Sequence, residues 1–85
     1  MSDNTVVLFY TGNFCKSCDE AKVSVELVSS LVDKVLYIDV DKEFKLAEER
    51  GVILIPTVIV LKDNLEVARF LGREVSKVVD YFSIG

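Results

Sequence analysis

The sequence predicts an α/β fold in which a four-stranded mixed sheet carries helices on both faces. Predicted strands alternate with predicted helices, which implies parallel strand neighbours joined by crossovers. Two later strands follow each other across a short turn, which adds an antiparallel pair. The strand cores VLFY and VIVL are apolar on both faces of the pleat, as in strands covered on both sides. The expected element order is β-α-β-α-β-β-α.

The first half of the chain predicts a strand, a helix and a second strand. Thr5–Tyr10 is rich in β-branched and aromatic residues and is flanked by turn residues, which is typical of a buried strand. Apolar residues then recur at helical spacing from about Cys15 to Val32, and Asn13 stands where an N-cap would be. Lys34–Val40 is the second predicted strand.

The second half predicts a short helix, a hairpin and a last helix. Asp41 is the expected N-cap of the short helix, and Gly51 stands at its C-terminal stop. The strands Pro56–Lys62 and Leu65–Leu71 are joined by Asp63–Asn64, and asparagine tolerates the positive φ that such turns need. The last helix has one apolar face, made of Val75, Val78, Val79 and Phe82.

Length, composition and charge narrow the class of protein. A chain of 85 residues predicts one domain, residues 1–85, and 51% hydrophobic residues can fill a dense core. The net charge is −4 and no stripe of Lys and Arg exists to neutralise phosphates, which argues against nucleic acid as a partner. The apolar runs are too short to span a bilayer, and the polar N-terminus lacks the basic start of a signal peptide. We therefore expect a cytoplasmic protein without a membrane partner.

The two cysteines of the chain, Cys15 and Cys18, are separated by two residues. Three interpretations are open: a redox pair, half of a metal site, or two small buried residues. A structural zinc or iron–sulfur site needs about four ligands. The chain has no histidine and no third cysteine, so a metal would require a dimer that shares two pairs. In a reducing cytosol such a pair is more often catalytic or metal-binding than a structural disulfide.

The position of the pair favours redox chemistry. It follows a predicted buried strand and opens a predicted helix in a β-α-β context. We expect Cys15 on the first helical turn, where free N–H groups and the helix dipole stabilise a thiolate. Cys18, one turn later, would lie on the same face and be more buried. The neighbouring Lys16 adds a positive charge that favours the thiolate.

Three stretches together resemble the thioredoxin superfamily, and most closely its small thioredoxin-like and glutaredoxin-like redox proteins. The first is Val6–Cys18, a strand that runs into the Cys-x-x-Cys motif. The second is Tyr37–Asp63, with an acidic strand end, a short helix, and Ile-Pro-Thr before an apolar strand. The third is the Leu-Gly-Arg sequence Leu71–Arg73. The resemblance covers roughly residues 5 to 82 and implies a thioredoxin-like fold.

The resemblance implies a thiol–disulfide oxidoreductase that reduces protein disulfides. Cys15 would be the nucleophile and Cys18 the resolving thiol, with a redox disulfide Cys15–Cys18 between them. No bound cofactor is expected. The expected partners are protein disulfide substrates and a reductant, either thioredoxin-reductase-like or glutathione, and a monomer is expected. Two alternatives remain open: a glutaredoxin-like, glutathione-dependent oxidoreductase, and a redox-inactive thioredoxin-fold binding module.

Further site residues are predicted around the cysteines. The resemblance implies that Pro56 is cis and faces the cysteines, which would expose the Ile55 backbone to an extended substrate segment. Gly72 would keep the substrate groove open, and Phe14 is expected to be a partly exposed apolar contact for partners. Two residues are expected to tune the thiols, namely Lys16 and Ser17.

The chain also departs from the thioredoxin pattern. Phe9 stands where thioredoxins carry a buried aspartate, and Tyr37 stands where they carry the paired lysine. The Cys-Lys-Ser-Cys motif lacks the usual Gly-Pro, and the extra N-terminal strand and helix of full thioredoxins are missing. The chain equally lacks the Thr-Val-Pro and Gly-Gly-acid signature that a glutaredoxin uses for glutathione.

Overall fold

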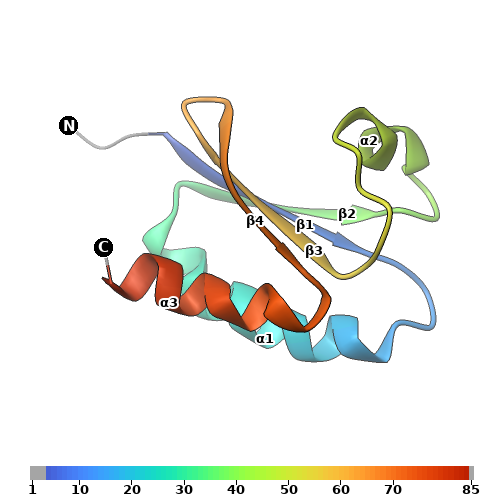
Figure 1. Ribbon diagram of the computed structural model, residues 1–85, viewed down its shortest axis with the longest axis horizontal. Helices are drawn as coiled ribbons and strands as arrows, with labels where there is room; N and C mark the ends of the chain where they lie inside the picture. Colours follow the sequence, from blue (N-terminus) through green and yellow to red (C-terminus); the bar gives the residue numbers. More distant parts are fainter. Residues whose placement is uncertain (1–3, 85) are drawn as a thin grey trace.

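A computed structural model describes residues 4–84 and confirms the predicted order of elements. Four strands form one sheet, with α1 and α3 on one face and the shorter α2 on the other (Figure 1). Short 3₁₀ segments follow α1 and precede α3. The elements are β1 Thr5–Thr11, α1 Lys16–Val28, β2 Lys34–Asp39, α2 Phe44–Glu49, β3 Thr57–Lys62, β4 Leu65–Leu71 and α3 Lys77–Ile84.

The sheet has the order β2-β1-β3-β4 and is mixed, as predicted. β1 pairs in parallel with β2 and antiparallel with β3, while β3 and β4 form an antiparallel hairpin. β1 and β3 are therefore the central strands, with backbone partners on both sides. Because both faces of a central strand meet other side chains, these two strands are apolar along almost their whole length.

Two apolar clusters lie on the two faces of the sheet. The first joins the sheet to α1 and α3, and its buried members are Val7, Phe9, Ala21, Val25, Val28, Val58, Val60, Val75 and Val78. The second joins the sheet to α2, and its buried members are Leu8, Tyr10, Ile38, Ala47, Ile59 and Leu61. Alternate residues of β1 thus enter alternate clusters, and β1 is held from both sides up to its C-terminal end.

The hairpin between β3 and β4 has the predicted turn. Asp63 and Asn64 have φ values of 52° and 69°, as the two central residues of a type I′ turn require. A register irregularity between Val60 and Leu61 bends the pairing with β4. The turn is tied to the start of β1, because Asp63 N–H donates to the Asn4 carbonyl at 2.8 Å.

The predicted N-caps of the first two helices are wrong. The N-cap of α1 is Cys15 rather than Asn13, because Phe14 adopts a φ of 55° and so delays the helix start. The N-cap of α2 is Glu43 rather than Asp41. Asp41 uses its carboxylate elsewhere: its Oδ2 accepts the Asn13 N–H at 2.7 Å.

The predicted C-terminal stop of α2 is confirmed. Gly51 follows α2 with a φ of 65°, and its N–H donates to the Glu48 carbonyl at 3.0 Å. Val52 N–H donates to the Ala47 carbonyl at 2.9 Å, which completes a Schellman motif. The first helix ends earlier than predicted, at Val28, and continues as a 3₁₀ turn.

The last helix buries the face that the sequence predicts. Val75 and Val78 are buried, and Val79 and Phe82 pack partly buried against the same cluster. The helix itself begins at Lys77, because the preceding residues form the 3₁₀ segment. Over residues 4–84, no helix is both long and apolar enough to cross a membrane.

We expect packing against α1 to dominate the stability of the fold. Val25 is 0% exposed in the cluster between α1 and the sheet, whereas Val23 on the same helix is 58% exposed. Val25→Ala removes two buried methyl groups and leaves a cavity, so it should lower the free energy of unfolding by about 2 kcal/mol. Val23→Ala, the same chemical change, should alter it by less than about 0.5 kcal/mol. Urea unfolding measures both, and equal losses would contradict this account of the core.

Candidate active site

A disulfide joins Cys15 and Cys18 at the point where β1 leads into α1. Their Cα atoms are 5.2 Å apart, within the usual range for a disulfide. Cys15 is the N-cap residue, with φ −109° and ψ 94°, and its carbonyl accepts the Cys18 N–H at 3.2 Å. Cys15 is therefore the residue at the start of the helix, where the helix dipole favours a negative charge, although its side chain makes no capping hydrogen bond.

The two sulfurs differ in accessibility. Cys18 is 4% exposed and lies among the buried residues of α1, whereas Cys15 is half-buried. The expectation that Cys18 is the more buried of the two is confirmed. A thiol reagent or a substrate disulfide can approach Cys15 from solvent, while Cys18 is shielded by the protein.

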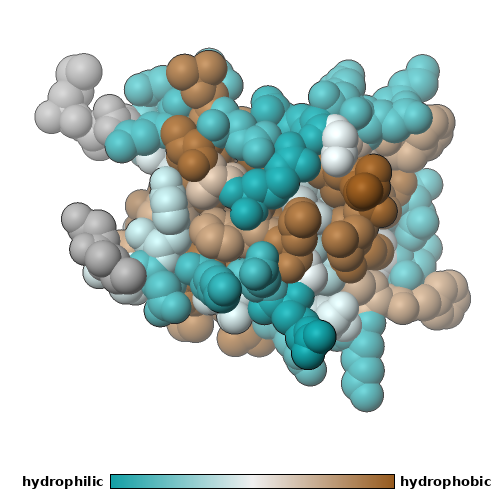
Figure 2. Space-filling model, viewed as in Figure 1, coloured by the Kyte–Doolittle hydropathy of each residue, from teal (hydrophilic) through white to brown (hydrophobic). Residues whose placement is uncertain are grey.

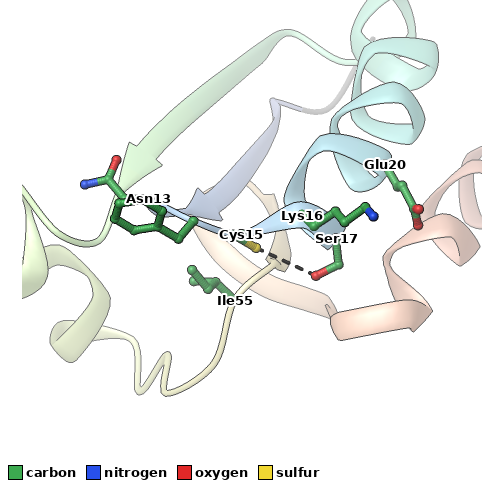
Figure 3. Close-up of a pocket in the computed structure, with 7 residues that line it drawn as sticks. Asn13, Cys15, Lys16, Ser17, Glu20 and Ile55 are labelled. Carbon is green, nitrogen blue, oxygen red and sulfur yellow. Dashed lines mark hydrogen bonds between the residues drawn. The ribbon is translucent and has the colours of Figure 1, made fainter.

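Cys15 opens onto a pocket beside the start of α1 (Figure 3). Ser17 and Lys16 extend from the first turn of α1, and Ile55 lies across from them on the segment before β3 (Figure 3). Ser17 Oγ is 3.7 Å from Cys15 Sγ. Because a disulfide sulfur carries no proton, the hydroxyl is the donor in this weak hydrogen bond. The pocket is lined by Asn13, Phe14, Cys15, Lys16, Ser17, Glu20 and Ile55.

The peptide bond between Ile55 and Pro56 is cis, as the resemblance implies. Pro56 itself is buried, and its carbonyl accepts the Gly72 N–H at 2.8 Å. Gly72 has a φ of 57°, so the backbone conformation favours glycine there, and an added Cβ would meet nothing within 4 Å. Gly72 lines a second pocket between α1 and the 3₁₀ segment before α3, and Ser17 borders both pockets.

The family model for thioredoxin matches residues 1–83. The chain belongs to the thioredoxin family. Thioredoxin-1 of Drosophila yakuba is 32% identical over 81 residues, which cover 92% of this chain and 76% of that protein. Thioredoxin 2 of Plasmodium falciparum is 28% identical over 72 residues and is matched over 46% of its length.

Solved thioredoxin structures share the fold. The germline-specific thioredoxin Deadhead of Drosophila melanogaster has a TM-score of 0.83 at 30% identity, covering 98% of this chain and 82% of that one. Thioredoxin of Fasciola hepatica has a TM-score of 0.81 at 25% identity, covering 95% of this chain and 80% of that one. Family membership and a Cys-x-x-Cys pair at disulfide distance are consistent with a thiol–disulfide oxidoreductase. Thioredoxin-family proteins in general act on protein disulfides, and a reductant returns their own disulfide to the dithiol.

An aromatic pair fills the place of the acid and lysine of other thioredoxins. Phe9 is 1% exposed, and its ring meets that of Tyr37 edge to face, with centroids 5.8 Å apart. The two residues are partners in the parallel pairing of β1 with β2. Neither ring can take a proton from a thiol at neutral pH, so these two positions supply no general base for Cys18.

Exposed apolar side chains neighbour Cys15 and Ile55 along the chain. Phe14 is more exposed than predicted, at 107%, so its whole ring is accessible next to Cys15. Ile53 is 93% exposed, and Leu54 is also exposed. Figure 2 shows apolar surface over the segment that joins α2 to β3, residues 50–56. Sequence reasoning missed Ile53 and Leu54, because their short apolar run before Pro56 has no periodicity that separates exposed from buried residues.

An arginine on β4 holds the segment that leads to Ile55 and Pro56. Arg69 donates to the Arg50 carbonyl at 2.7 Å and to the Gly51 carbonyl at 3.5 Å. Glu66 accepts two hydrogen bonds from the same guanidinium, at 2.8 Å and 2.9 Å. This bidentate hydrogen bond from Arg69 lowers the pKa of Glu66 below its usual value. The sequence contains no local signal for this contact, because Arg69 and Arg50 are 19 residues apart.

Within residues 4–84, no group of three or more His, Cys, Asp or Glu side chains is arranged to hold a metal ion.

The predicted residues Phe14, Lys16, Ser17 and Ile55 all share the pocket of Cys15. Pro56 and Gly72 lie beside that pocket and are linked to each other by a backbone hydrogen bond.

The difference in exposure predicts a strict order of modification in the reduced protein. Iodoacetamide should label Cys15 first, with Cys18 at least about tenfold slower, because only an accessible thiolate reacts readily. Peptide mapping by mass spectrometry measures the two rates, and both should become similar in 6 M guanidinium chloride, roughly the concentration that unfolds stable domains. Equal rates in the folded protein would contradict the burial of Cys18.

Proposed function

We propose that this protein is a thioredoxin-like protein disulfide reductase. The observation that carries the proposal is the Cys15–Cys18 disulfide, with one accessible sulfur at a helix start and one buried sulfur behind it. Nucleophilic attack needs an exposed thiolate, and resolution needs a second thiol within bonding reach. The pair supplies both, and the family comparisons support the same chemistry.

The proposed reaction begins from the reduced pair. The Cys15 thiolate attacks one sulfur of a substrate disulfide, and the other substrate sulfur leaves as a thiolate that takes up a proton. Cys18 loses its proton and attacks the Cys15 sulfur of the mixed disulfide. That step releases the second substrate sulfur as a thiolate, which is then protonated, and forms the Cys15–Cys18 disulfide. Two electrons pass from the protein to the substrate, and no bound cofactor takes part.

The substrate segment is proposed to lie beside the cis peptide bond. Ile55 lines the pocket of Cys15, which supports the proposal that its backbone pairs like a strand with an extended substrate. The exposed Phe14 ring is proposed to supply apolar contact on the other side of the sulfur. Gly72 donates its N–H to the Pro56 carbonyl and has open space at its Cβ position, and it is proposed to keep the groove open.

A second reaction must return the pair to the dithiol. We propose a thioredoxin-reductase-like donor rather than glutathione, because the relatives in Drosophila are thioredoxins and the Leu-Gly-Arg-Glu stretch lacks a glutaredoxin signature. The proposed location is the cytoplasm, where such reductants keep protein thiols reduced. The protein is proposed to act as a monomer.

Two serine variants test the proposed roles. Cys15→Ser should abolish reduction of insulin disulfides, with a loss of at least about a hundredfold, because the attacking sulfur is gone. Cys18→Ser should also lose turnover, but it should accumulate a mixed disulfide on Cys15 because nothing resolves it. Turbidity of precipitating insulin chains measures turnover, and mass spectrometry identifies the adduct.

Each contrary result has a defined meaning. A Cys15→Ser protein that reduces insulin as fast as the unmodified protein would exclude the proposed nucleophile. Persistent glutathionylation of Cys15, with resetting by glutathione alone, would favour a glutaredoxin-like enzyme. A reduced pair that never forms a disulfide in glutathione redox buffers, with partner binding retained in the double serine variant, would favour a redox-inactive binding module.

Ser17 is expected to tune the attacking thiol. Its hydroxyl, 3.7 Å from the Cys15 sulfur, can donate to a thiolate after reduction and so stabilise the reactive form. Ser17→Ala should slow iodoacetamide labelling of Cys15 at pH 7 by about twofold to tenfold, in line with the loss of one hydrogen bond to a charged group. Ser24→Ala, on the same helix, is the control and should leave the rate unchanged. Identical rates for Ser17→Ala and Ser24→Ala would remove Ser17 from the tuning of the thiol.

A further inference from the structure

Carboxylates close both ends of the parallel pair formed by β1 and β2. At the start of β1, Asp33 Oδ2 accepts the Thr5 N–H at 2.7 Å. Beyond the end of β1, Asp41 Oδ2 accepts the Asn13 N–H at the same distance of 2.7 Å. The separation is 28 residues in both cases, which is also the offset of the β1–β2 register, as in Val6 opposite Lys34. The two carboxylates therefore extend the ladder beyond its regular backbone pairs.

The Asp41 end of this ladder lies against the redox site. Asn13 immediately precedes Phe14, whose φ is 55°, and Cys15 follows as the N-cap of α1. A left-handed conformation is costly for an aromatic residue and persists where its surroundings hold it. The hydrogen bond from Asn13 N–H to Asp41 restrains the chain one residue before the strained position.

Asp41 is itself held in place. Its own N–H donates to Asp39 Oδ1 at 2.9 Å, and the intervening Val40 N–H donates to the Thr11 carbonyl at 2.8 Å. Gly12 packs closely under the carboxylate, since a Cβ there would lie 3.0 Å from Asp41 Oδ2 and 2.8 Å from Ile55 Cδ1. One tight cluster thus connects the end of β1, the segment after β2 and the pocket residue Ile55.

We propose that Asp41 is a positioning residue for the redox site. Its carboxylate acts as a hydrogen-bond acceptor that holds Asn13, keeps Phe14 in its left-handed conformation, and so keeps Cys15 at the N-cap position of α1. Asp41 touches neither sulfur nor substrate in this account. The expected effect of Asp41 on disulfide reduction rests on the proposed function. The expected effect on the reactivity of the Cys15 thiol does not.

Three variants separate positioning from charge and from stability. Asp41→Ala removes both the acceptor and the charge. Asp41→Asn removes the charge but keeps an oxygen that can accept the Asn13 N–H. Asp33→Ala is the matched control, because it removes the equivalent carboxylate-to-backbone hydrogen bond at the opposite end of the same strand pair. Urea unfolding of each variant establishes that it folds and how much stability it has lost.

The primary measurement is the rate of iodoacetamide labelling of Cys15 in the reduced, folded proteins at pH 7. Asp41→Ala should slow labelling by about threefold or more, because a sulfur displaced from the helix start loses part of the stabilisation of its thiolate. Asp41→Asn and Asp33→Ala should stay within about twofold of the unmodified protein, the size of a weak surface effect. The same ranking is expected for insulin reduction.

Several outcomes would overturn the proposal. Asp41→Ala labelled at the rate of the unmodified protein would show that the hydrogen bond does not position Cys15. If Cys15 is labelled as slowly in Asp41→Asn as in Asp41→Ala, the effect comes from the lost charge. If labelling is equally slow in Asp33→Ala, the effect comes from general destabilisation. If the unmodified protein fails to reduce insulin, the proposed function fails, while the labelling rates still decide whether Asp41 positions the thiol.

Discussion

The structure depends on the hydrogen bonding of β1 on both of its edges. β1 pairs in parallel with β2 and antiparallel with β3, and its side chains enter the apolar clusters on both faces of the sheet. A strand held in this way has a fixed end point, and the redox pair follows that end within a few residues. The buried strand therefore serves as a rigid support, and the accessible sulfur is placed where the chain first leaves the core.

The residues around the sulfurs come from four separate parts of the chain. The loop after β1 supplies Phe14 and Cys15, the first turn of α1 supplies Ser17, and the segment before β3 supplies Ile55. The 3₁₀ segment after β4 supplies Gly72, which donates to the carbonyl before β3. Asp41 restrains the first of these parts and Arg69 restrains the third, so both sides of the Cys15 pocket are tied to the sheet.

The chain combines the thioredoxin arrangement with an unusual interior. Where a buried acid and its lysine are expected from the family pattern, the edge-to-face contact of Phe9 with Tyr37 leaves an apolar strand pair. Phe9 is buried, which stabilises the sheet and avoids the cost of a buried charge at that position, while Tyr37 contacts its ring from an exposed position. In the proposed reaction, these two positions therefore supply no general base for Cys18.

The sequence alone determined the features that depend on neighbouring residues. The order of strands and helices, the Asp63–Asn64 turn, the stop at Gly51 and the pairing potential of Cys15 with Cys18 all arise from local spacing and conformational preference. The tertiary structure decided what depends on register between distant segments. Asp41 was expected to cap its own helix, yet its carboxylate accepts a backbone N–H 28 residues away, and α1 has Cys15 rather than Asn13 as its N-cap. Local propensity cannot reveal such a contact, because an aspartate carboxylate can accept a hydrogen bond from an N–H at a helix start or from an N–H far away in the sequence. Only the packed sheet decides which of these N–H groups lies within reach.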